Sequence, residues 1–187
     1  MNAPIDVSDI RIETTRLILR PWTMADLEDL YEYASVPGVG EAAGWNHHRS
    51  VEESRQILQL FIDHRKTFAI VWKETGKVIG SLGIEKIKDI PEIPEHLQGR
   101  ELGYVLNKAY WGRGLMTEAV DAVIRYCFGV LHYDYLTCGH FIQNDRSRRV
   151  IEKNGFQFLK MVSFETHYGT VEDTNLYILY APKEENP

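Results

Sequence analysis

The residues with the clearest chemical potential are Gly112, Arg113 and Gly114, which stand just before a long apolar helical pattern. A helix N-terminus presents unpaired backbone N–H groups and the positive end of the helix dipole, and both favour a bound phosphate or pyrophosphate. Glycine lets the backbone approach such an anion closely, and Arg113 offers a charged donor. The segment therefore predicts an anion-binding turn, with a plain strand-to-helix turn that uses glycine for its geometry as the alternative.

Two common phosphate-binding motifs do not fit this turn. A dinucleotide-binding fingerprint requires a further glycine where this chain has Thr117. The nucleoside-triphosphate loop ends in Gly-Lys followed by Ser or Thr, and the chain contains no such tripeptide. The alternative interpretation, that the chain is a nucleotide-binding regulator, is therefore supported only by the Gly112–Gly114 turn.

The elements that must position this turn indicate a mixed sheet flanked by helices. Thr23 and Ser50 are expected helix N-caps, Asn144 or Asp145 is the expected third, and Gly155 is placed to end a helix. Only the late strand–helix–strand section is typical of a parallel crossover, so the expected class is α/β of the α+β type with a mostly antiparallel central sheet. The predicted elements are strand 16–21, helices 24–34 and 51–66, strands 67–73, 77–86 and 101–106, a long helix from Leu115, strand 134–138, helix 144–154, and strands 156–165 and 171–180.

Three separated segments of the chain resemble one enzyme family. Residues 101–104 (Glu-Leu-Gly-Tyr) and 110–119 (Tyr-Trp-Gly-Arg-Gly-Leu-Met-Thr-Glu-Ala) resemble the acetyl-CoA signature of the GNAT superfamily of N-acetyltransferases. Asn144, Ser147 and residues 149–156 are similar to the helix that follows it. Residues 13–20 are similar to the start of the branch that acetylates ribosomal-protein N-termini at alanine or serine. The resemblance covers about residues 11–181, so we expect one N-acetyltransferase domain with a GNAT-like sheet over residues 1–187.

The resemblance implies a set of contacts to the acyl donor, acetyl-CoA. Backbone amides at the turn would hold its pyrophosphate, although Trp111 and Met116 depart from the family's usual residues at the two ends of the motif. The preceding strand would pair with the pantetheine arm like an added strand, and Asn144 would bond that arm from the other side. The implied cofactor-binding residues are Tyr104, Val105, Leu106, Trp111, Gly112, Arg113, Gly114, Leu115, Met116, Thr117, Asn144 and Ser147.

Direct transfer of an acetyl group to an amine also requires a base and donors for the negative charge that develops on oxygen. Glu101 is the predicted base, acting through a water, because it lies in an otherwise apolar strand; a solvated edge-strand glutamate is the alternative. A strand N–H near Val105 or Leu106 is the predicted oxyanion donor. Many relatives place a tyrosine acid where this chain has Ile151, so Ser147 is the predicted second catalytic residue, with helix capping as its alternative.

Other reactive side chains have simpler interpretations. His47 and His48 are adjacent and lack a third ligand at a suitable spacing, so no metal site is expected. His140 lies two residues from Cys138 without an evident orienting group, which argues against a nucleophilic pair. Cys127 and Cys138 are predicted to be free, partly buried thiols in a reducing compartment.

The composition limits the classes of molecule that the protein is expected to bind. The 21 Lys and Arg against 27 Asp and Glu give a net charge of −6, which provides no overall attraction to nucleic acid or anionic membranes. The N-terminus lacks the layout of a signal peptide, and no apolar run is long enough to span a bilayer. We therefore expect a cytoplasmic protein, with homodimerisation left open. The acidic balance suits a cationic amine or a basic peptide as the second substrate.

The predicted function is an N-acetyltransferase that uses acetyl-CoA without a metal or a covalent enzyme intermediate. The resemblance favours the N-terminal α-amine of a protein, such as a ribosomal protein, as the acceptor. A small amine, an amino acid or an amine antibiotic remains an alternative acceptor. A catalytically inactive CoA-binding or interaction module is the alternative from another class.

Overall fold

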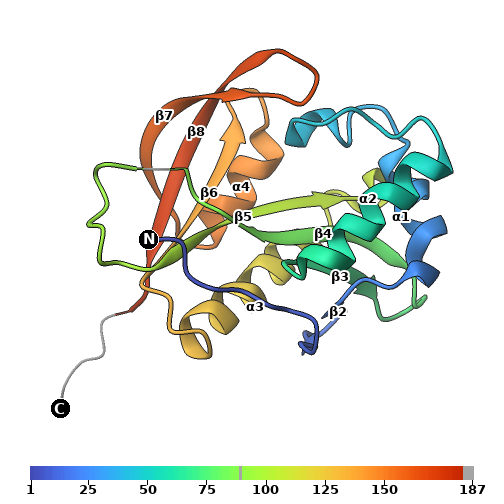
Figure 1. Cartoon of the computed structure of the whole chain (residues 1–187), viewed down its shortest axis with the longest axis horizontal. Helices are drawn as coiled ribbons and strands as arrows, with labels where there is room; N and C mark the ends of the chain where they lie inside the picture. Colours follow the sequence, from blue (N-terminus) through green and yellow to red (C-terminus); the bar gives the residue numbers. More distant parts are fainter. Residues whose placement is uncertain (89, 183–187) are drawn as a thin grey trace.

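The computed structural model describes residues 1–88 and 90–182, whose strands form one eight-stranded sheet (Figure 1). The strands lie in the order β1-β2-β3-β4-β5-β6-β8-β7. They are β1 (Ile12–Glu13), β2 (Leu17–Arg20), β3 (Thr67–Trp72), β4 (Val78–Glu85), β5 (Gly99–Leu106), β6 (Tyr135–Phe141), β7 (Gln157–Glu165) and β8 (Val171–Tyr180). The helices are α1 (Leu27–Ala34), α2 (Val51–His64), α3 (Leu115–Gly129) and α4 (Asp145–Lys153), with short 3-10 turns η1 (Met24–Asp26), η2 (Glu41–Ala43) and η3 (Lys108–Tyr110).

The pairing of the strands confirms the predicted mixed, mostly antiparallel sheet. Only β5 and β6 pair in parallel, and α3 connects them as the crossover helix. The other neighbouring pairs of named strands are antiparallel. The glycine turn at 112–114 therefore lies at the carboxyl end of β5, where a strand feeds the N-terminus of a helix.

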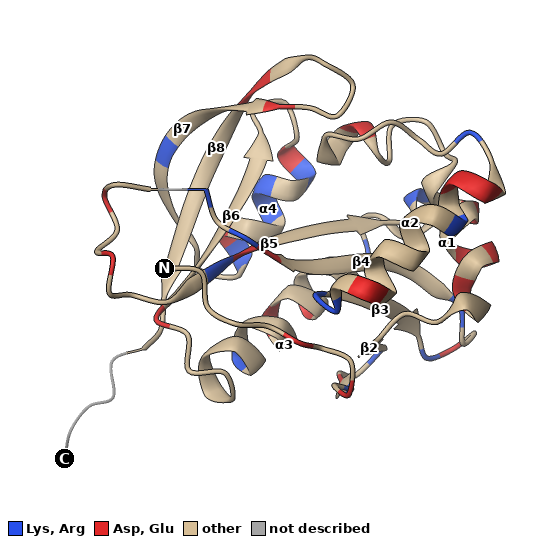
Figure 2. Cartoon of the chain, in the orientation of Figure 1, with Lys and Arg blue, Asp and Glu red and all other residues tan. Residues whose placement is uncertain are grey.

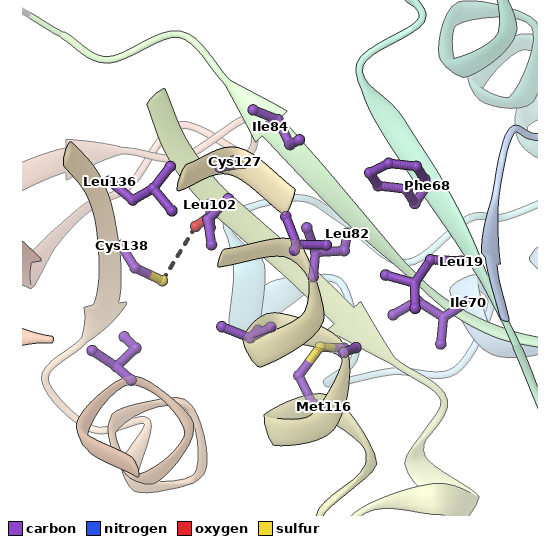
Figure 3. Close-up of a cluster of buried hydrophobic side chains, with 14 of the residues drawn as sticks. Leu19, Phe68, Ile70, Leu82, Ile84, Leu102, Met116, Cys127, Leu136 and Cys138 are labelled. Atoms are coloured by element: carbon purple, nitrogen blue, oxygen red, sulfur yellow. Dashed lines mark hydrogen bonds between the residues drawn. The ribbon is translucent and has the colours of Figure 1, made fainter. Parts of the chain in front are cut away.

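Helices cover the two faces of the sheet with separate apolar clusters. One cluster joins α3 and Ile151 of α4 to strand residues such as Leu102 and Cys138 (Figure 3). The second joins α1 and Leu58 of α2 to the opposite face, which carries Val105 of β5. Because side chains alternate along a strand, Leu102, Tyr104 and Leu106 face α3 and α4, whereas Glu101, Gly103 and Val105 face the other side.

Local hydrogen bonds fix the helix starts that matter for the site. Ser50 Oγ accepts from Glu53 N at 3.1 Å, and Asn144 Oδ1 accepts from Ser147 N at 3.2 Å, so both expected N-caps are observed. Gly155 follows α4 with φ +82, as a helix-ending glycine does.

Two boundaries differ from the prediction and shape the site. β5 begins at Gly99 rather than at Glu101, and β6 continues to Phe141 rather than ending at Cys138. The extension of β6 pairs only with β8, since the parallel pairing with β5 ends at Leu102 and Cys138. The two strands therefore part while both still continue.

The β7–β8 hairpin reaches over to the segment that follows α1 (Figure 1). His167 N donates to Gly44 O at 2.8 Å, and the Tyr168 hydroxyl donates to Glu41 O at 3.3 Å. Asn144 Nδ2 donates to Ala42 O at 3.3 Å from the start of α4. These bonds hold η2 above the point where β5 and β6 part.

Within residues 1–88 and 90–182, we find no helix with the length and apolar character that crossing a membrane requires.

Candidate active site

A cavity of about 640 Å³ opens where β5 and β6 part. It runs from the glycine turn, along the edge of β5, to η2 and the β7–β8 hairpin. All of the site residues predicted from the sequence line it except Arg113. The structure thus brings together residues from β5, the turn, α3 and α4, namely Glu101, Tyr104, Val105, Leu106, Trp111, Gly112, Gly114, Leu115, Met116, Thr117, Asn144 and Ser147.

The backbone of β5 offers unpaired groups to this cavity. Asn107 N donates to Ile79 O at 2.7 Å, so the odd-numbered residues of β5 direct their amides toward β4. The N–H groups of Tyr104 and Leu106 consequently point to the side from which β6 has departed. Of the two predicted oxyanion donors, Leu106 is placed toward the cavity, and Val105 is not.

The turn before α3 has the geometry of an anion cradle. Gly112 and Gly114 have φ of +77 and +74, a left-handed conformation that L side chains rarely adopt. A Cβ at Gly112 would meet no atom within 4 Å, so the space above the turn is open. Trp111 Nε1 donates to Leu106 O at 2.8 Å and ties the turn to the end of β5.

A buttress from the N-terminal segment holds the start of α3. Glu118, in the first turn of α3, accepts from the Thr14 hydroxyl at 2.6 Å and from Arg16 N and Nε at 2.8 and 2.7 Å. Arg16 Nη1 also donates to Arg113 O at 2.9 Å. The predicted similarity at 13–20 therefore marks residues that position the turn from behind.

The glutamine variant of Glu118 is expected to unfold with about 2 kcal/mol less free energy at pH 7, because three bonds to a carboxylate are weakened. Burial alone would raise the pKa of Glu118, but the bonds from Thr14 and Arg16 bring it below its usual 4.5. A lowered pKa gives stability that is present above 4.5 and lost as pH falls through the folded-state value. Urea unfolding should show the gap between E118Q and the unaltered protein closing below about pH 4.5; a constant gap would contradict this.

Cationic side chains near the turn lie differently from the prediction. The Arg113 guanidinium stacks 5.2 Å from the Trp72 ring and 5.5 Å from the Tyr110 ring, so it does not line the cavity. Arg146, Arg149 and Lys153 of α4 do line it, and Arg146 stacks 4.1 Å from the Trp111 ring. Figure 2 shows these charges as bands along α4. Sequence reasoning missed them, although their helical spacing already placed them on one face.

Glu101 is a partly buried carboxyl on the cavity wall. Burial raises its pKa above the usual 4.5, the Thr137 hydroxyl lowers it by donating at 3.4 Å, Glu85 raises it, and Lys88 lowers it. The net pKa is raised, which brings the carboxylate closer to the range where it can accept a proton near neutral pH.

Tyr104 and Ser147 form a hydroxyl pair on the opposite side of the gap. Tyr104 Oη lies 2.9 Å from Ser147 Oγ and 3.2 Å from Ser147 O. Burial raises the pKa of Tyr104 well above its usual 10, so the phenol keeps its proton. Sequence reasoning assigned Tyr104 only a backbone contact, and nothing in its spacing indicated this pairing.

The far end of the cavity is apolar. It is lined by Val39, Ala42 and Ala43 around η2, and by the Phe141 and Phe164 rings, which meet at 5.7 Å. None of these residues is charged, and Lys88 Nζ lies over the Phe164 ring, 5.4 Å from its centroid. This end can therefore receive an uncharged or apolar group beside Glu101.

The remaining reactive side chains make local contacts, although His140 lines the cavity and its buried Nε2 has no hydrogen-bond partner among the described residues. His47 Nδ1 lies 2.7 Å from Glu41 Oε1, and His48 Nδ1 lies 2.7 Å from Ser54 Oγ. Cys138 Sγ donates to Leu102 O at 3.2 Å, while His140 Nδ1 donates to Phe141 O at 2.8 Å. Among the described residues, no three or more His, Cys, Asp or Glu side chains are grouped to hold a metal ion.

Both cysteines are free, as predicted, and they are fully buried rather than partly buried. Burial raises the pKa of Cys127 to about 12 and raises the pKa of Cys138 as well. Neither thiol is therefore a ready nucleophile at neutral pH.

Comparison with known proteins agrees with this geometry. The family model for the acetyltransferase (GNAT) domain matches residues 16–157. The chain is 28% identical over 181 residues to the uncharacterized N-acetyltransferase YoaA of Bacillus subtilis, covering 92% of this chain and 98% of that protein. It is 30% identical to the uncharacterized N-acetyltransferase p20 of Bacillus licheniformis, covering 77% and 80%.

The fold is also that of a solved acetyltransferase. The crystal structure of ribosomal-protein-S5-alanine acetyltransferase from Vibrio fischeri has a TM-score of 0.72 at 22% identity, covering 96% of this chain and all of that one. The match of the family model over most of the chain settles the family. This chain belongs to the GNAT acetyltransferases, enzymes that take their acetyl group from acetyl-CoA.

Proposed function

We propose that this enzyme acetylates the N-terminal α-amine of a protein, with Glu101 as the base. One observation carries the proposal: a single cavity joins an anion-binding helix start to the Glu101 carboxyl and to the apolar end around η2, Phe141 and Phe164, which we call the mouth. The first feature suits the donor, the second suits proton removal from an amine, and the third suits an acceptor without a negative charge near that amine.

The residues present fit acetyl-CoA. The amides of the turn from Gly112 to Thr117 would hold the pyrophosphate, since both glycines leave the approach open. Arg146, Arg149 and Lys153 would add positive charge for the phosphates. Tyr104 would pair with the amide-bearing arm along the free edge of β5, which leaves the Leu106 N–H for the thioester oxygen, and Asn144 would bond the arm from α4.

The residues that take up and deliver protons lie on opposite sides of the gap between β5 and β6. Acetyl-CoA supplies the acetyl group as a thioester. Glu101 accepts the proton that the amine must lose, through a water where needed. The Leu106 N–H stabilises the negative charge that develops on the thioester oxygen. Ser147, whose Oγ lies 2.9 Å from Tyr104 Oη, passes the other proton that the amine loses to the leaving sulfur, so that Ser147 and Tyr104 both end the turnover protonated.

The mouth favours a peptide over a free amino acid. A free amino acid carries a carboxylate beside its amine, and the lining around η2 and the phenylalanine pair is apolar, with Lys88 Nζ placed over the Phe164 ring at 5.4 Å rather than bonded to a lining group. A peptide N-terminus has an amide there instead, and its following residues can leave along the β7–β8 hairpin. The acidic net charge of −6 favours a basic partner, such as a ribosomal protein. The buried free thiols are compatible with the cytoplasm, where we place the enzyme.

A matched pair of acceptors tests the proposal. The kcat/KM for a peptide that begins with alanine or serine should exceed that for the free amino acid by about 100-fold, because the free carboxylate would be desolvated against a largely apolar lining and close to the Glu101 carboxylate. The same peptide with a blocked N-terminus and an internal lysine is the control, and it should not react. Preference for free amino acids or small amines would overturn the proposed acceptor while leaving the family assignment intact.

A further inference from the structure

The reaction releases a proton that must leave a buried site. A protonated amine and a thioester give an amide, a thiol and one free proton. Glu101 accepts that proton in the proposed function, and this inference rests on that role. Glu101 is partly buried and lines the cavity, so with both substrates in the cavity its carboxyl needs a route to solvent that does not pass through them.

The structure places a second carboxyl beside Glu101. Glu85 of β4 is the antiparallel register partner of Glu101, so the two side chains rise from adjacent strands on the same face. Two like charges directly opposite each other destabilise a sheet, and the pairing of strands does not require them. The opposed Glu85 and Glu101 therefore call for a functional explanation.

A pair of glycines gives Glu85 its space. Gly83 and Gly103 are register partners on the same face, next to the two glutamates. A Cβ at Gly83 would stand 2.6 Å from Glu85 Oε1, and a Cβ at Gly103 would stand 3.9 Å from Glu85 Cγ. The Glu85 side chain thus lies over Gly83 and Gly103, which carry no side chains, and Gly103 and Glu101 of the neighbouring strand line the cavity.

The other end of Glu85 reaches solvent. Its carboxylate bonds Lys66 Nζ, and the side chains of Glu85 and Lys66 are 39% and 31% exposed. The charged or titratable groups around Glu101 include Glu85 with Lys66, Lys88 after β4 and the Cys138 thiol of β6, while Thr137 of β6 contributes a hydroxyl. Toward η2 and β7 the lining is apolar, and Lys88 Nζ lies 5.4 Å from the centroid of the Phe164 ring.

We propose that Glu85, held by Lys66 over Gly83 and Gly103, is a proton-transfer residue that carries the proton of Glu101 to solvent. The proton leaves the Glu101 carboxyl, directly or across one water, and Glu85 passes it to bulk water. Glu101 is then a carboxylate again, and no other reactant is needed.

The first test separates kcat from KM. Because proton exit follows acetyl transfer, E85Q should lower kcat by at least about tenfold and leave kcat/KM within about twofold. A small diffusible buffer such as imidazole should restore kcat in E85Q, since it carries the proton instead. E92Q is the matched control, because Glu92 is also a half-exposed partner of a lysine, Lys160 at 2.7 Å.

The second test compares two variants that should shift the pH profile of kcat/KM in opposite directions. Removing the negative charge in E85Q should move the acidic limb of the kcat/KM profile to lower pH, by between about 0.5 and 2 units. K66M leaves the Glu85 charge without its partner and should move that limb to higher pH. Titration of the Glu101 carboxyl by 13C NMR in the free protein should show the same two directions without any substrate.

The outcomes are distinct. An unchanged kcat in E85Q, or a lowered kcat that buffer does not restore, would overturn the route through Glu85. Shifts of the same sign in E85Q and K66M would show that Glu85 does not act on Glu101 by its charge and would also overturn it. If E101Q retained full turnover, Glu101 itself would be excluded, and the proposed function's base would fail together with this inference.

Discussion

Replacing Glu101 with glutamine is expected to lower kcat/KM for acetyl transfer by about 100-fold or more, while the Kd for CoA stays within about twofold. Glutamine keeps the size and polarity of the side chain but cannot accept a proton. The carboxyl lies on the side of the sheet that faces the mouth, away from the glycine turn, so donor binding should not depend on its charge.

The raised pKa of Glu101 also predicts the direction in which activity changes with pH. Because burial raises the pKa of Glu101 above 4.5, the fraction of carboxylate and therefore the activity should rise with pH through that raised value. In E101Q this limb should disappear, and the residual activity should rise at higher pH as more of the acceptor loses its proton in solution.

Steady-state kinetics across pH and calorimetric titration with CoA measure both quantities. E92Q, a surface variant outside the cavity, should behave as the unaltered enzyme. Unchanged turnover of E101Q at neutral pH would remove Glu101 from the mechanism.

Replacing Gly114 with valine should weaken CoA binding by about 100-fold or more. A branched side chain is strained at φ +74, so the turn must rearrange and its amides lose their common direction. Losing two charge-assisted bonds to the pyrophosphate would account for such a factor. The nearest atom to a Cβ at Gly114 is Arg16 Nη2 at 3.7 Å, so the protein itself has room for the side chain.

Gly76 provides a matched control. It also has φ +74 and meets no atom within 4 Å, but it lies in the β3–β4 turn and does not line the cavity. G76V should lose about 1–2 kcal/mol of stability from the same backbone strain and retain CoA affinity. Wild-type affinity in G114V, or an equal loss of affinity in G76V, would contradict the assignment of the glycine turn.

The sequence predicted the sheet well because its signals are local. Alternating apolar residues, glycine-containing turns and N-caps such as Ser50 and Asn144 are set by neighbours a few residues away, and each was found in place. The crossover followed from the order of strand, helix and strand between residues 99 and 141.

What the sequence could not predict depends on contacts between distant elements. The stacking of Arg113 on Trp72 requires knowing that the β3–β4 turn lies beside η3. The pairing of Tyr104 with Ser147, and of Glu85 with Glu101, follows from register and from the face on which each side chain falls. A one-residue change in strand register would move the Tyr104, Glu85 and Glu101 side chains to the opposite face of the sheet.

The most direct test of acetyl transfer at this cavity follows labelled acetyl-CoA with a peptide that begins with alanine. The label should appear on the peptide's α-amine, in equal amount to the CoA thiol released, with the unaltered enzyme. Both signals should fall together by about 100-fold in E101Q, which still binds CoA. CoA binding by the unaltered enzyme with no thiol released for any peptide or amine would contradict catalysis and favour a CoA-binding module.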